Sequence, residues 1–191
     1  MGEPAFRHLD YEEYLALERE TGLKHEYCDG EVLAMAGGSA DHALIALNLG
    51  TLLRVALRGG PCRPFGSDWK LWLEDSQRAA YPDLSVVCGP IERPPHDPDA
   101  ATNPVLVAEV LSPSTEAHDR GPKAGDYRRH GSVQTLLLLD SQRVHVEVQT
   151  RNADGSWTLR DHGPGGRIEL PALGIVVEVD ALYEDAELLR R

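Results

Sequence analysis

The sequence predicts a mixed α/β or α+β fold, in which helices flank a mixed β-sheet. Between residues 41 and 57, apolar side chains recur at helical spacing and form one stripe opposite a polar face. Residues 83–88 and 105–111 are short apolar segments typical of buried strands. Residues 136–139 are apolar on both faces, as expected of a central strand. Together these patterns predict a sheet covered by helices.

Further helices and strands are expected along the rest of the chain. The expected ranges are, in order, a helix at 10–20, a hairpin at 24–35, a strand at 69–73, a helix at 122–129, and β-structure at 144–149, around Trp157 and at 175–179. The dipeptide Asp29-Gly30 marks the hairpin turn, because both residues tolerate the backbone conformation of tight hairpins. We expect the proline-rich residues 90–104 to form an exposed loop.

Length and composition predict a single domain spanning residues 1–191. The chain has 191 residues, 41% of them hydrophobic, which is enough to bury a sizeable core. No apolar run approaches membrane length and none resembles a signal peptide, so we expect a cytoplasmic protein without a membrane partner. The three cysteines, Cys28, Cys62 and Cys88, form no Cys-x-x-Cys pair and suggest neither a disulfide framework nor a zinc site.

Two carboxylates, Asp83 and Glu109, interrupt segments that otherwise resemble buried strands. An ionised carboxylate in such a strand loses its hydration, so it must be hydrogen-bonded, paired or bound to a cation. If the two strands are neighbours, the carboxylates converge on one face and would repel each other unless a cation lies between them. Mg²⁺ prefers such oxygen ligands. Alternatively, Asp83 ends a strand and Glu109 pairs with an arginine.

Several short motifs resemble the Uma-two family of restriction-endonuclease-like proteins. They are Pro82-Asp83, the run from Glu109 to Thr115, Lys123 with Tyr127, the run from Glu26 to Val32, the turn Gly37-Gly38-Ser39, and His42. The resemblance covers roughly residues 10 to 145. It implies a restriction-endonuclease-like core and a metal-dependent endonuclease that hydrolyses phosphodiester bonds, with DNA as the expected substrate. It also implies that Asp83, Glu109 and the backbone carbonyl of Val110 hold Mg²⁺ or Mn²⁺.

The sequence departs from the superfamily pattern at Leu111, two residues after Glu109, where a lysine is usual. A leucine cannot polarise a phosphate, and the resemblance implies that Lys123 on the following helix replaces it. Gly121-Pro122 suits the first turn of a helix, because proline lacks the N–H that such a position leaves unbonded. Lys123 and Tyr127 would then lie one turn apart on one face. A solvated surface lysine and a packing tyrosine are the alternatives.

Two further residues have open roles. Glu31 follows the hairpin turn, and the resemblance implies an additional catalytic carboxylate there. A solvent-facing strand residue is an equal alternative. His42 lies near the start of the helix expected from Asp41, where a histidine is more often a surface or capping residue than a catalyst.

The net charge argues against extended nonspecific DNA binding by a monomer. Nineteen Lys and Arg against 31 Asp and Glu give a formal charge of −12, whereas nucleic-acid-binding proteins commonly present a basic face. Four basic residues do lie near the expected site: Arg120, Lys123, Arg128 and Arg129. A homo-oligomer, a dimer or higher, could gather these residues around one groove. The alternative function is a non-catalytic interaction or DNA-binding module that retains the nuclease fold.

Overall fold

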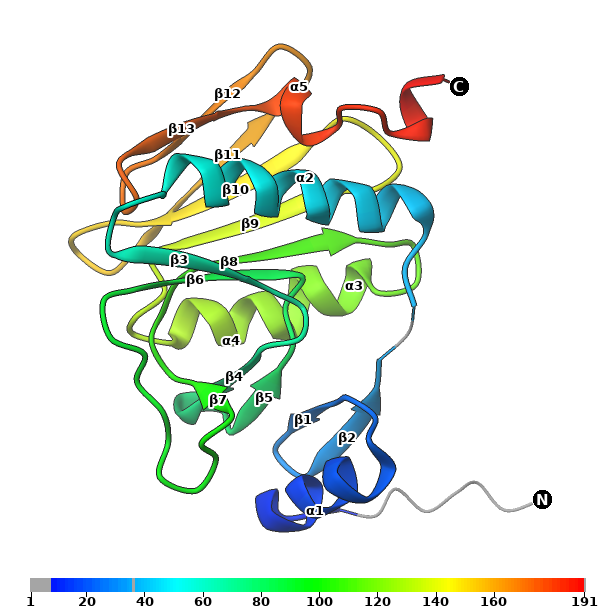
Figure 1. Ribbon diagram of the computed structural model, residues 1–191, viewed down its shortest axis with the longest axis vertical. Coiled ribbons are helices and arrows are strands. Elements are labelled where there is room, and N and C mark those ends of the chain that lie inside the picture. The colour runs from blue at the N-terminus through cyan, green and yellow to red at the C-terminus, as the bar shows by residue number, and fades with distance from the viewer. Residues whose placement is uncertain (1–7, 36, 191) are drawn as a thin grey trace.

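A computed structural model describes residues 8–35 and 37–190, and a six-stranded mixed sheet is its centre (Figure 1). The strands are, in spatial order, β11 (Trp157–His162), β10 (Val146–Arg151), β9 (Thr135–Asp140), β8 (Pro104–Leu111), β6 (Leu84–Cys88) and β3 (Cys62–Gly66). Strands β8 and β9 are parallel, and the other neighbours in this sheet are antiparallel. The mixed sheet with flanking helices confirms the expected fold class.

Helices cover both faces of this sheet (Figure 1). Helix α2 (Ala40–Ala56) packs on one face, and the crossover from β8 to β9 packs on the other. The crossover consists of α3 (Glu116–His118), the π-helical η2 (Asp119–Lys123) and α4 (Ala124–Arg129). The side chains of β8 alternate between the two helix-covered faces, because successive side chains of a strand point to opposite sides of the sheet. Its Ala108 joins the core beneath α2, whereas Val107 joins the core beneath α4.

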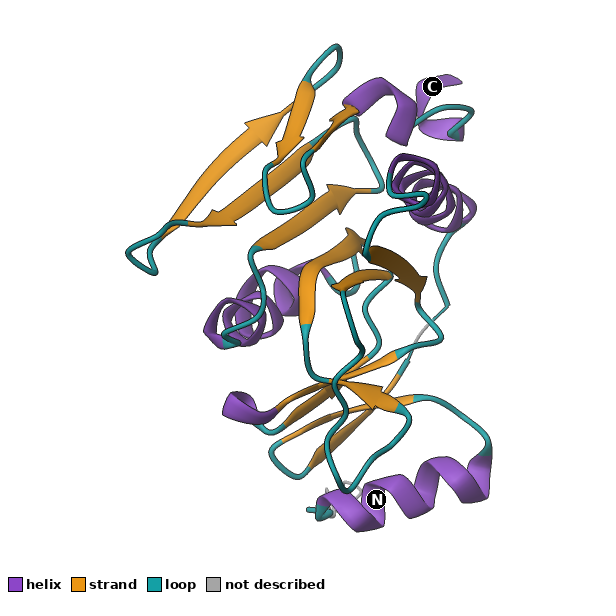
Figure 2. Cartoon of the chain, turned by 60° about the vertical axis from the view of Figure 1, so that its left-hand side comes forward, coloured by secondary structure: helices purple, strands orange, loops and turns teal. Residues whose placement is uncertain are grey.

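A second sheet lies beside the first, towards the N-terminal end of the molecule (Figure 2). Its strands are, in spatial order, β2 (Glu31–Ala34), β1 (His25–Cys28), β5 (Arg78–Ala80), β4 (Lys70–Leu73) and β7 (Ala100–Ala101). Helix α1 (Tyr11–Thr21) packs its buried Tyr14 against this sheet, and η1 (Glu74–Ser76) joins β4 to β5. The predicted hairpin is present, with Asp29 and Gly30 both at positive φ, 45° and 91°.

The C-terminal segment packs over α2. It contains the hairpin of β12 (Arg167–Leu170) and β13 (Ile175–Glu178), followed by α5 (Val179–Leu182) and η3 (Glu187–Arg190). The side chain of Asn48 on α2 donates hydrogen bonds to the carbonyl oxygens of Leu182 and Glu184, at 3.2 and 3.0 Å. Within the described residues, no helix is both long and apolar enough to cross a membrane.

Three expectations need correction. The crossover helix does not begin at Gly121-Pro122 but runs without a break from Glu116 to Arg129. Pro122 fits inside it because the π-helical turn is wider: the N–H of Ala124 donates to the carbonyl oxygens of Asp119 and Gly121. The loop of residues 90–104 is not wholly exposed either, since it contributes the buried strand β7 to the second sheet.

The third correction concerns the cysteines. Cys62 and Cys88 form a disulfide, with Cα atoms 3.9 Å apart, and Cys28 is free. The two residues face each other in the antiparallel register of β3 and β6. Their separation of 26 positions does not reveal that register, so the cysteine spacing alone could not predict the bond.

Candidate active site

Asp83 and Glu109 meet at one end of the central sheet, as predicted. Asp83 directly precedes β6, and Leu84 pairs with Ala108 of β8, so the next pair in this antiparallel register is Asp83 with Glu109. The backbone N–H of Val110 donates to Oδ2 of Asp83 at 2.7 Å. Both carboxylates line a cavity of about 360 Å³. The two acids therefore lie side by side at an opening of the protein surface.

Lys123 reaches the same cavity from the π-helical turn of the crossover. Its Nζ lies 2.9 Å from Oε1 of Glu109, 2.7 Å from Oε1 of Glu26 and 3.7 Å from Oδ1 of Asp119. Only 5% of the residue is exposed. Burial disfavours its charge, but Glu109, Glu26 and Asp119 together raise the pKa of Lys123 well above its ordinary value. The ammonium therefore stays protonated at neutral pH and cannot act as a base.

Glu109 is held by two donors on one oxygen. Oε1 accepts the Lys123 ion pair and a hydrogen bond from the hydroxyl of Tyr127 at 2.7 Å. Lys123 and Tyr127 are thus one turn apart and point to the same atom. Burial raises the pKa of the Glu109 carboxyl to about 8, although the charge of Lys123 opposes this shift. The second oxygen, Oε2, accepts no hydrogen bond from any described residue.

The structure explains why the lysine comes from the helix. Leu111 shares the face of β8 with Val107 and Glu109, and this face is covered by the crossover helix. Leu111 is only 2% exposed and belongs to the same apolar cluster as Tyr127 and Leu138. A lysine there would enter the core, whereas Lys123 approaches Glu109 along the border of the cavity.

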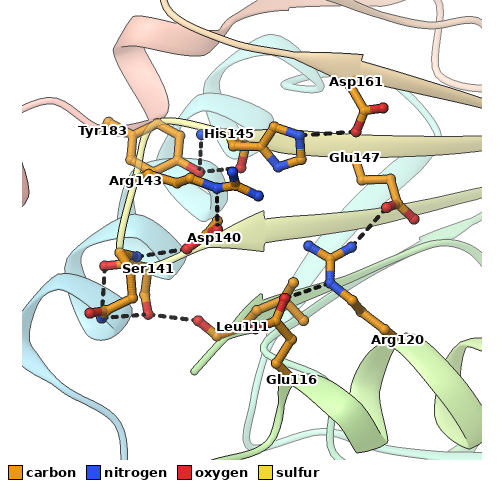
Figure 3. Close-up of polar contacts among 11 residues, drawn as sticks. Leu111, Glu116, Arg120, Asp140, Ser141, Arg143, His145, Glu147, Asp161 and Tyr183 are labelled. Carbon is orange, nitrogen blue, oxygen red and sulfur yellow. Dashed lines mark hydrogen bonds and ion pairs between the residues drawn. The ribbon is translucent and has the colours of Figure 1, made fainter. Parts of the chain in front are cut away.

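Polar contacts connect the crossover to the central sheet. In Figure 3, Arg120 lies between Glu116 and Glu147, and each contact is 2.7 Å long. Glu147 belongs to β10, so this arginine ties the helical segment to the sheet three residues before Lys123. At the end of β8, the hydroxyl of Ser141 donates to the carbonyl of Leu111 at 2.6 Å (Figure 3). The end of β8 and the middle of the crossover are thereby tied to the strands that follow.

His42 borders the cavity from the first turn of α2. Its backbone N–H donates to the Oγ of Ser39, the residue that caps the helix. Its Nε2 lies 3.3 Å from Oδ2 of Asp83. The hydrogen bond to Asp83 raises the pKa of His42, and partial burial opposes this effect. His42 and the Val110 N–H therefore both contact Oδ2 of Asp83 and orient this carboxylate.

Glu31 is not brought to this group of side chains. It is an exposed residue of β2, paired with Cys28, and it does not line the cavity. The acid that β1 contributes is Glu26, which is 7% exposed and contacts Lys123. Sequence reasoning missed it, although a carboxylate next to the buried Tyr27 of a strand is the signal that identified Asp83 and Glu109.

The basic residues near the site do not form a free basic surface. Arg120 pairs with Glu116 and Glu147, Arg128 donates to the amide oxygen of Gln149, and Arg129 pairs with Asp126. Lys123 is buried. The basic side chains of this helix therefore have hydrogen-bond or ion-pair partners within the chain, although Arg129 itself is exposed.

The two carboxylates fit a divalent cation by their donor chemistry. Oδ1 of Asp83 and Oε2 of Glu109 have no partner among the described residues, and both acids face the cavity. The described residues contain no group of three or more His, Cys, Asp or Glu side chains placed to hold a metal. Two carboxylates completed by water and phosphate oxygens are, however, the usual protein share of a Mg²⁺ site.

Comparisons with known proteins identify the family and the fold. The model of the Uma2 family, described as "Putative restriction endonuclease", matches residues 11–180. Two uncharacterized proteins of Synechocystis sp. are similar: slr1290 is 40% identical, covering 93% of each chain, and sll1609 is 34% identical, covering 85% of this chain and 93% of its own. A crystal structure titled as a putative nuclease belonging to DUF820, from Anabaena variabilis, has the same fold. Its TM-score is 0.75 at 19% identity, with 92% of this chain and 97% of that chain covered.

Proposed function

The chain belongs to the Uma2 family of restriction-endonuclease-like proteins, and we propose that it is a metal-dependent endonuclease that hydrolyses phosphodiester bonds of DNA. One observation carries the proposal: two carboxylates with free oxygens and a buried, protonated lysine converge on one cavity. Carboxylates for a cation and a fixed positive charge are the groups that phosphodiester hydrolysis requires.

Asp83 and Glu109 would hold Mg²⁺ or Mn²⁺, together with the backbone carbonyl of Val110. When bound, the cation supplies positive charge to the phosphate and lowers the pKa of a coordinated water. Tyr127 and the Val110 N–H keep the two carboxylates in place, because each donates to one of their oxygens. The remaining oxygens would then be available to the cation.

Lys123 would donate to a non-bridging oxygen of the scissile phosphate. Its raised pKa keeps it charged, so it stabilises the negative charge that grows on the phosphate as water attacks and the ester bond breaks. Glu26 and Asp119 also contact the ammonium and hold it in place. Lys123 therefore acts as an electrostatic donor rather than as the base that activates water.

The test combines metal binding with cleavage. Calorimetric titration with Mn²⁺ should show binding that Asp83→Asn and Glu109→Gln each weaken sharply, whereas Glu12→Gln, on the exposed face of α1, should bind as the wild type does. Supercoiled plasmid should be cut in Mg²⁺ and not in EDTA. Equal Mn²⁺ affinity in all four proteins would refute the shared site. Metal binding without cleavage of single- or double-stranded DNA would favour the non-catalytic module.

A further inference from the structure

Three hydroxyl side chains border the candidate active site beyond the end of β8. Ser112, Ser114 and Thr115 belong to the short segment that joins β8 to the crossover, and all three line the same cavity as the two carboxylates. The Oγ of Ser112 lies 3.0 Å from the Oγ of Ser114 and 2.9 Å from the Oγ1 of Thr115. The three oxygens therefore form one hydroxyl cluster on the wall of the cavity.

This hydroxyl cluster has one more hydrogen-bond donor than it uses. Each hydroxyl carries one proton, and the three hydroxyls share two hydrogen bonds, both of which involve Ser112. Within residues 8–35 and 37–190, these hydroxyls have no other acceptor. One proton is therefore left for an acceptor outside the protein, such as the oxygen of a ligand.

The acids next to the cluster are paired with basic side chains. Residues 112–115 contain no acid. Glu116 contacts Arg120 at 2.7 Å, and Asp119 lies 3.7 Å from the ammonium of Lys123. Serine and threonine hydroxyls are common donors to the phosphate oxygens of nucleic acids. In a chain with a formal charge of −12, the cluster offers a phosphate donors that need no free basic side chain.

We infer that the hydroxyl cluster binds the phosphate that neighbours the scissile phosphate on the same strand. The inference rests on the proposed nuclease function, in which Asp83 and Glu109 hold the cation beside the scissile phosphate. Glu109 is only 4% exposed and has a free oxygen at the cavity. Ser112 follows it by three residues, so their Cα atoms are about 10 Å apart at most. A phosphate one nucleotide further along the strand therefore comes within reach of the cluster.

Calorimetric titration with thymidine 3′,5′-bisphosphate, in Ca²⁺ in place of Mg²⁺, tests the inference without requiring cleavage. This ligand carries a phosphate on each side of one nucleoside, so each phosphate can occupy one of the two positions. The wild type should bind it about tenfold more tightly than it binds thymidine 5′-monophosphate or 3′-monophosphate, because a hydrogen bond to a charged oxygen is added. This comparison needs no variant.

Variants attribute the gain in affinity to the cluster. The triple variant Ser112→Ala/Ser114→Ala/Thr115→Val lacks all three hydroxyls, so it should lose the gain while keeping the wild-type affinity for the monophosphates and for Mn²⁺. The exchange Ser114→Thr/Thr115→Ser keeps every hydroxyl and should keep the gain. Ser156→Ala is the matched control, since Ser156 is an exposed serine whose hydroxyl is hydrogen-bonded in a turn but does not line the cavity. It should bind as the wild type does.

The monophosphates separate this inference from the proposed function. Wild-type protein that binds none of these nucleotides in Ca²⁺ would count against the phosphate site itself, and the inference would fail with it. Wild-type protein that binds the bisphosphate no more tightly than the monophosphates would overturn the inference alone and leave the proposed function standing. A triple variant that keeps the full gain would also overturn it, because another part of the protein would then bind the second phosphate.

Discussion

Two buried lysines, Lys70 and Lys123, have similar immediate partners but very different surroundings. Each is 5% exposed and lies within 3.1 Å of two carboxylate oxygens. Lys70 pairs with Glu18 at 3.1 Å and with Asp97 at 2.8 Å, and it does not line the cavity of the candidate active site. Lys123 and both of its close partners line the cavity of the candidate active site.

The difference lies in what satisfies the carboxylates. Around Lys70, the hydroxyl of Tyr81 donates to Glu18 and that of Tyr11 donates to Asp97 at 2.7 Å, so the cluster is closed by aromatic side chains. Around Lys123, one oxygen of Glu109 remains without a partner and faces open space. A buried lysine between acids therefore does not by itself identify a catalytic site. An adjacent cavity with free ligand oxygens does distinguish the two.

The largest effect that this comparison predicts is on stability. Lys70→Met leaves Glu18 and Asp97 buried without a counter-charge, and it should lower the free energy of unfolding by roughly 3–5 kcal/mol. Lys123→Met should cost less, because its partners face a cavity that water can enter. Urea denaturation of both variants in EDTA measures the difference. If the two variants lost the same stability, the contrast between a closed and an open cluster would be wrong.

The rate of DNA cleavage should depend on Lys123 and not on Lys70, the reverse of the order expected for stability. Lys123→Ala removes a fixed positive charge from the transition state, and the rate of plasmid cleavage in Mg²⁺ should fall by roughly 10²–10³, or about 3–4 kcal/mol. Mn²⁺ affinity should change little, because the lysine is not a ligand. Lys70→Met, assayed at a temperature where it remains folded, should cut at close to the wild-type rate. Wild-type activity in Lys123→Ala would make this lysine structural, like Lys70.

The stability of the metal-free protein should depend on pH through Glu109. Its pKa is raised to about 8 in the folded state. At pH values between the ordinary pKa of a glutamate and 8, the folded protein therefore keeps a proton that the unfolded chain has lost. Stability contributed by this group is therefore present at low pH and falls as pH rises, by up to about 1.4 kcal/mol per unit within that window. Urea denaturation in EDTA at several pH values should show this fall in the wild type. Glu109→Gln should show a shallower one, and parallel profiles would contradict the assignment.

The sequence predicted the parts of the fold that depend on local pattern. Residues 136–139 are apolar on both faces because β9 lies between β8 and β10, and Asp29-Gly30 forms its turn from its own backbone preferences. Strands β3 and β5 were missed. The first contains Pro64 and Gly66, which are unfavourable in strands and tolerated at a sheet edge. The second begins with Arg78, whose charge is compensated by the distant Asp126.

The residues of the candidate site also divide into those that the sequence predicted and those that it missed. Asp83, Glu109 and Lys123 were identified from short motifs, and the structure brings them together. Glu26 was missed because its role depends on Lys123, which lies far along the chain and meets it only after both sheets have formed. Glu31 was chosen instead because the family resemblance implies a catalytic carboxylate at that position. Sequence spacing shows which residues could meet, but tertiary packing decides which of two nearby acids turns inward.

The smallest predicted effect concerns single hydroxyl groups in the two clusters. Tyr127→Phe and Tyr11→Phe each remove one hydrogen bond of 2.7 Å to a carboxylate, from Glu109 and Asp97 respectively. Each should lower the free energy of unfolding by about 1 kcal/mol. Only Tyr127→Phe should also slow cleavage, by several-fold, because Glu109 loses a donor that fixes its orientation towards the cation. Thermal denaturation and initial cleavage rates, measured on the same preparations, separate the two effects. If Tyr11→Phe also lowered the cleavage rate, the Lys70 cluster would be coupled to the active site. The two lysine clusters would then differ in their distance from the active site and not in whether they affect it.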